Sequence, residues 1–103
     1  MNLIDMHCDT VGKILDSKNG ESLRENPFSV NLEGMKKAGT MAQFFANFIY
    51  LKQFQGEDKY ERLYERAMCM IRRIKEEVGA CSKEMALALN AQDILHNKET
   101  GKI

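Results

Sequence analysis

The chain opens with the stretch Leu3-Ile4-Asp5-Met6-His7-Cys8-Asp9, which indicates its fold class more directly than any other segment. Apolar and polar side chains alternate along it, and a period of two is typical of a β-strand. In such a strand Asp5, His7 and Asp9 point to the same side. We therefore predict that the first element is a strand that presents an imidazole and carboxylates on one face.

The segments that follow predict helices and a second strand. A short helix or turn is expected at Val11–Leu15, and a helix of about two turns is expected between Asn31 as N-cap and Gly39 as terminator. The stretch Thr40–Tyr50 carries bulky apolar side chains on both faces, as in a strand that is covered on both sides. This order favours an α/β fold with a parallel, helix-covered sheet.

The second half of the chain predicts further helices. Apolar residues recur at steps of three and four over Asp58–Val78, which indicates a strong amphipathic helix, and charged residues such as those in Arg72–Glu77 are expected to form its solvated face. Ser82 is a suitable start for a short helix over Lys83–Leu89. Asn90 is then expected to cap Ala91–Asn97.

The last residues, Gly101-Lys102-Ile103, leave the final helix and enter an apolar residue, as at the start of another strand. With this third strand the pattern is that of the opening of a βα series. We interpret residues 1–103 as one partial domain, which contains the first two strands, their helices and the beginning of a third strand.

Composition excludes several classes of function. Fifteen Lys and Arg balance fifteen Asp and Glu, so no net field favours nucleic acid or an anionic membrane surface. The most apolar run, Met41–Leu51, is shorter than the roughly 20 residues that span a bilayer. Cys8, Cys69 and Cys81 match no disulfide framework and no paired zinc motif, so free thiols are expected. The opening residues show no secretory signal, which predicts a cytoplasmic protein.

His7 and Asp9 are the candidate metal ligands. Neutral imidazole and carboxylate oxygen both suit zinc, and both side chains are expected at the carboxyl end of the first strand, where barrel enzymes have their active sites. A His followed two residues later by an Asp is common by chance. A half-buried His that only hydrogen-bonds its neighbours is therefore the alternative interpretation.

The opening motif resembles that of the membrane (renal) dipeptidase family of the amidohydrolase superfamily. Two later segments are also similar to this family: the residues from Asn31 to Gly39, and Ala42-Gln43-Phe44-Phe45 after them. The resemblance covers essentially the whole chain but only about the first third of a family member. It implies the N-terminal part of a (β/α)8 TIM barrel.

The resemblance also implies a function. A complete family member is a metallodipeptidase that holds two zinc ions and uses a metal-activated water to cleave the peptide bond of a dipeptide. Only His7 and Asp9 carry over as metal ligands, and no catalytic residue does. This chain has Cys8 where members of the family often have an Asn, and the Cys8 side chain is expected to point away from the ion. We expect the 103-residue chain to be a fragment with little or no activity alone.

Other interpretations remain open. The helix over 58–78 is suited to a non-catalytic interaction module that offers its apolar stripe to a partner. Unpaired strand edges favour self-association into a homo-oligomer. A thiol-dependent redox protein is the weakest alternative, because the sequence has no paired cysteine motif. Cys69 and Cys81 are expected to be packing residues. His96 is expected to be solvated, and Gln43 and Asn47 to share one face of the second strand.

Overall fold

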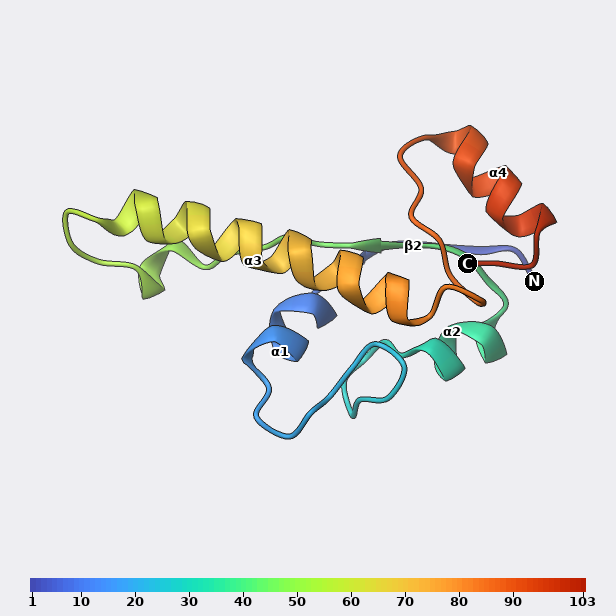
Figure 1. Ribbon diagram of the computed structural model, residues 1–103, viewed down its shortest axis with the longest axis horizontal. Coiled ribbons are helices and arrows are strands. Elements are labelled where there is room, and N and C mark those ends of the chain that lie inside the picture. Colours follow the sequence, from blue (N-terminus) through green and yellow to red (C-terminus); the bar gives the residue numbers. More distant parts are fainter.

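The computed structural model describes residues 1–103 and shows a mixed α/β fold built on a two-stranded parallel sheet (Figure 1). Strand β1 (Leu3–Cys8) is followed by helix α1 (Thr10–Asp16), a long connection, helix α2 (Leu32–Ala38) and strand β2 (Thr40–Phe45). Leu3 is in register with Thr40, and Asp5 is in register with Gln43. The predicted α/β class and parallel pairing are therefore confirmed, with an irregular register between Asp5 and Cys8.

Helix α2 begins and ends where the sequence predicts. The side chain of Asn31 accepts a hydrogen bond from the Gly34 N–H at 2.8 Å, which satisfies one of the free donors of the first turn. Gly39 ends the helix with φ +70°, a conformation that favours glycine. A Cβ at this position would lie 2.7 Å from the Met1 carbonyl oxygen, so close packing of the N-terminus also requires glycine.

The second half contains a 3-10 turn η1 (Leu51–Gln53), the long helix α3 (Lys59–Ala80) and helix α4 (Ala91–Glu99). Helix α3 packs against α1, while α2 and α4 contact β2. The beginning of α3 and the loop before it extend beyond the other elements in Figure 1, and the molecule is accordingly elongated, at 48 × 30 × 20 Å. No helix combines the length and the apolar character needed to cross a membrane.

One prediction about the helices of the second half is wrong. The expected helix over Lys83–Leu89 does not form, because Glu84 and Met85 donate to the Cys81 carbonyl in a tight turn and the next residues are extended. The backbone of Ile103 then holds this extended segment through its bonds with Glu84 and Ala86, at 2.8 and 3.0 Å. By contrast, the Asn90 cap on α4 is confirmed, since its side chain accepts from the Asp93 N–H at 2.9 Å.

Strand β2 is shorter and more open than predicted, because it ends at Phe45 rather than Tyr50. Phe44, Phe48 and Tyr50 are 45%, 61% and 51% exposed, so the stretch is not covered on both sides. The physical reason is that β1 ends at Cys8, the register partner of Phe45, so the residues after Phe45 have no strand beside them. The tail from Gly101 to Ile103 does not form a strand either, although Ile103 packs against the core.

The core lies between α1, α2, α3 and the connection before α2. Its buried members are Ile14, Leu23, Leu32, Met35, Val78, Cys81 and Met85. Glu77 is buried beside them, which contradicts the prediction that Arg72–Glu77 forms a solvated face; Arg72, Lys75 and Glu76 are exposed as expected. Glu77 stays in the core because it has hydrogen-bond partners there.

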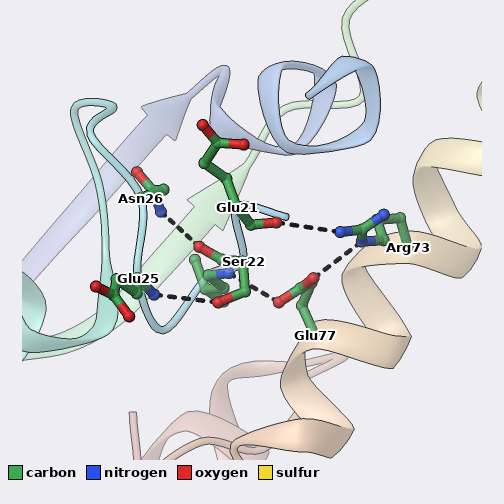
Figure 2. Close-up of polar contacts among 7 residues, drawn as sticks. Glu21, Ser22, Glu25, Asn26, Arg73 and Glu77 are labelled. Carbon is green, nitrogen blue, oxygen red and sulfur yellow. Dashed lines mark hydrogen bonds and ion pairs between the residues drawn. The ribbon is translucent and has the colours of Figure 1, made fainter. Parts of the chain in front are cut away.

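Figure 2 shows the bonds that hold Glu77. One of its carboxylate oxygens accepts from the Leu23 N–H at 2.7 Å, and the other accepts from Arg73 Nε at 2.9 Å. Arg73 also donates to the Glu21 carbonyl at 3.3 Å. We call Glu21, Leu23, Arg73 and Glu77 the Glu77 anchor. It joins the long connection to α3 across 54 residues of sequence.

Candidate metal-binding site

His7 and Asp9 meet at the carboxyl end of β1. His7 Nε2 lies 3.2 Å from Asp9 Oδ1, and the two side chains are 63% and 54% exposed. Asp9 occupies the N-cap position of α1, but its side chain makes no capping hydrogen bond. The Asp9 carboxylate therefore faces the imidazole and solvent, and the two groups form an accessible donor pair.

The spacing of this pair suits a zinc ion. Zinc bonds to His nitrogen and carboxylate oxygen at about 2.0–2.1 Å, and two donors at tetrahedral angles then lie about 3.3 Å apart. The observed 3.2 Å between Nε2 and Oδ1 agrees with that edge length, and it also suits a direct hydrogen bond. No third His, Cys, Asp or Glu joins the pair to complete a ligand set.

Asp5 lies one pleat before His7 and is linked to it through the backbone. The Asp5 carboxylate accepts a hydrogen bond from the His7 N–H at 3.2 Å. The pKa of Asp5 is lowered, first by a hydrogen bond from the Gln43 side chain and then by the His7 N–H. Asp5 is therefore ionised at neutral pH and is held between two strands.

Cys8 separates the two candidate ligands in sequence but lies in different surroundings. It is 8% exposed, whereas His7 and Asp9 on either side of it are open to solvent. Burial raises the pKa of the Cys8 thiol, and this effect exceeds the opposing hydrogen bonds with Thr10. Cys8 is thus a packed, protonated thiol.

A shallow basin adjoins Asp9. Its walls come from α1, from the loop after β2 and from α3, and its residues include Asp9, Gly12, Lys13, Phe48, Tyr50 and Arg66. Arg66 is held in this wall by two bonds to the Asp16 carboxylate, at 2.5 and 2.8 Å. The basin gives the pair an open approach from solvent.

The other candidate residues from the sequence lie away from His7 and Asp9. Cys81 is buried in the core, and Cys69 is half-buried with its sulfur 3.4 Å from Arg72 Nη2. His96 is exposed on α4, as predicted. Gln43 contacts Asp5, whereas Asn47 donates to the Ala67 carbonyl on α3 at 3.3 Å.

The apolar stripe of α3 is divided between the core and solvent. Met70 and Val78 are buried within the chain itself, while Tyr60 and Tyr64 near the beginning of the helix are 72% and 67% exposed. The most exposed members of the stripe therefore lie near the beginning of the helix.

Comparison with known proteins finds no relative of this chain. No protein-family model, no curated protein and no solved structure matches the chain. The fold and the candidate site therefore stand on the geometry described above.

Proposed function

We propose that this chain forms the first part of a zinc-dependent, dipeptidase-like barrel hydrolase, in which His7 and Asp9 bind one metal ion. The observation that carries the proposal is the 3.2 Å separation of His7 Nε2 and Asp9 Oδ1 on exposed side chains at the carboxyl end of a parallel strand. Active sites of barrel enzymes lie at this end of the strands. The family resemblance of the opening motif supports the same assignment.

Each residue of the pair has a distinct role in the proposal. His7 offers the lone pair of Nε2, and Asp9 offers a negatively charged oxygen, which together suit a borderline-soft dication. A zinc ion held there would acidify a water and polarise a substrate carbonyl. Because two protein donors leave a zinc site incomplete, we expect the 103-residue chain to bind zinc weakly and to hydrolyse dipeptides little, if at all.

The open edge of β2 supports the barrel part of the proposal. An apolar groove runs along Met41–Phe45, with its opposite wall built from Met85–Ala88, α4 and Ile103. All of its lining residues except Gln43 and Asn97 are apolar. In a closed barrel every strand has neighbours on both edges, so we assign this groove to a third parallel strand.

The metal part of the proposal is tested by zinc titration of the full chain, followed through the imidazole NMR signals of both histidines. We expect zinc to shift the signals of His7 and to leave those of His96 unchanged. His7→Ala and Asp9→Ala should each abolish saturable binding, whereas the matched control His96→Ala should keep it. Binding that survives His7→Ala, or that is lost in His96→Ala, would overturn the assignment.

The hydrolase part is tested by the coding sequence that follows the Ile103 codon. The resemblance implies a next strand that carries a Glu able to bridge two zinc ions, with His-bearing strands after it. Finding these would support a two-zinc dipeptidase. A stop codon directly after Ile103, with no related sequence beyond it, would remove the catalytic interpretation and leave only the metal pair.

A further inference from the structure

Gln43 connects the second strand to the candidate metal ligands on the first. Asp5 and Gln43 are register partners across the β1–β2 ladder, and both line the same small pocket beside the sheet. Gln43 Nε2 donates to the Phe44 carbonyl at 3.3 Å, which leaves its second N–H for the Asp5 carboxylate, and the Gln43 side chain lowers the pKa of Asp5. Both Asp5 and Gln43 are half-buried, whereas His7 and Asp9 beyond them are exposed.

Asp5 also contacts the backbone of His7. Its Oδ1 accepts from the backbone N–H of His7 at 3.2 Å, so Asp5 links its register partner Gln43 to the backbone that carries the imidazole. The register of the strands is irregular just beyond this point. The backbone at His7 consequently relies on the Asp5 contact as well as on the sheet ladder.

We infer that Gln43 and Asp5 are positioning residues that orient His7 toward Asp9 for a divalent cation. Asp5 is no ligand in this arrangement, because no third acidic, Cys or His side chain joins the pair. The inference rests on the proposed metal-binding function and deepens it. A site with few ligands depends on their orientation before the ion arrives, and loss of an outer contact typically weakens metal binding by about 10- to 100-fold.

The test compares zinc affinity and side-chain order in four proteins: the parent chain, Gln43→Leu, Asp5→Asn and the control Gln92→Leu. Gln92 is exposed on α4, so its substitution repeats the chemical change away from the sheet. Zinc affinity is measured by calorimetry, and the χ1 preference of His7 is measured by NMR couplings without metal. Thermal unfolding without metal reports on the fold.

We expect Gln43→Leu and Asp5→Asn each to weaken zinc binding about tenfold. Both should average the His7 χ1 couplings, while unfolding without metal changes little. Gln92→Leu should match the parent chain in all three measurements. A merely structural role would lower the unfolding temperature and leave the His7 couplings of the folded protein unchanged, which would overturn the inference.

The two failures are distinguishable. If the parent chain shows no saturable zinc binding but Gln43→Leu still averages the His7 couplings, the proposed metal function fails and the positioning role stands. If zinc binds the parent chain and both affinity and couplings are unchanged in Gln43→Leu and Asp5→Asn, the positioning role fails and the metal site stands.

Discussion

The Glu77 anchor and the His7–Asp9 pair contain similar polar groups in opposite surroundings. The Glu77 carboxylate is 10% exposed and accepts bonds from a backbone N–H and a guanidinium, whereas His7 and Asp9 are 63% and 54% exposed and contact mainly each other. A buried carboxylate must keep its partners, because losing them costs desolvation energy that nothing repays. An exposed pair can exchange its mutual bond for water or an ion at little cost. The first arrangement stabilises the fold, and the second leaves donors free to bind.

Of the substitutions considered, Glu77→Ala should lower the stability of the fold most. The substitution leaves the Leu23 N–H buried without an acceptor and removes the partner of Arg73. We expect the free energy of unfolding in urea to fall by about 3 kcal/mol. The control Glu76→Ala, at an exposed position on the same helix, should change it by less than about 0.5 kcal/mol. Equal losses in both variants would show that the anchor contributes no stability.

Glu77 also marks the limit of what the sequence predicts here. Local periodicity correctly predicted β1, the Asn31 and Asn90 caps, the Gly39 terminator and a long helix at α3, because each depends on neighbours a few residues away. Glu77 sits in a run of mixed charge that is typical of a solvated face. Its partner Leu23 lies 54 residues away, and no local pattern encodes such a contact.

The same reasoning explains the other differences. Lys83–Leu89 has good helical propensity, but backbone bonds from Ile103 to Glu84 and Ala86 hold an extended segment there, so tertiary contacts override propensity. At the candidate site the pattern correctly predicted β1 through Cys8 and drew attention to His7 and Asp9. The contact between Asp5 and Gln43 required the register of two strands, which the sequence alone did not provide.

A smaller loss of stability is expected at Asn31, where the connection held by the Glu77 anchor meets α2. Asn31→Ala removes the side-chain acceptor for the Gly34 N–H and should lower the free energy of unfolding by about 1 kcal/mol. Asn19→Ala, at an exposed bend in the same connection, serves as the control and should have almost no effect. Thermal unfolding followed by circular dichroism measures both. An unchanged Asn31→Ala protein would mean that α2 is held by its packing and not by its cap.

Removing both His7 and Asp9 should change the stability of the fold still less. We expect the double variant His7→Ala/Asp9→Ala to unfold within about 0.5 kcal/mol of the parent chain in the absence of metal. Zinc at ten times its dissociation constant should stabilise the parent chain by about 1.4 kcal/mol, and a chelator should reverse this gain. The double variant should not respond to zinc. A large loss of stability without metal would mean that the pair belongs to the structural group together with the Glu77 anchor.

The smallest effect on stability is expected from Cys8. This buried residue lies on β1 next to the exposed His7, so one strand contains both a buried and an open environment. Because burial raises the pKa of this thiol above 9.0 in the folded chain, the unfolded chain releases the proton at a lower pH. The contribution of Cys8 to stability is therefore complete below pH 9 and declines as pH rises through the folded pKa. Unfolding of the parent chain and Cys8→Ala should converge slightly between neutral and alkaline pH, and alkylation of Cys8 in the folded chain should begin at a higher pH than in urea. A Cys8 that reacts equally in both states would be as open to solvent as His7 and Asp9, and the two sides of β1 would then no longer differ.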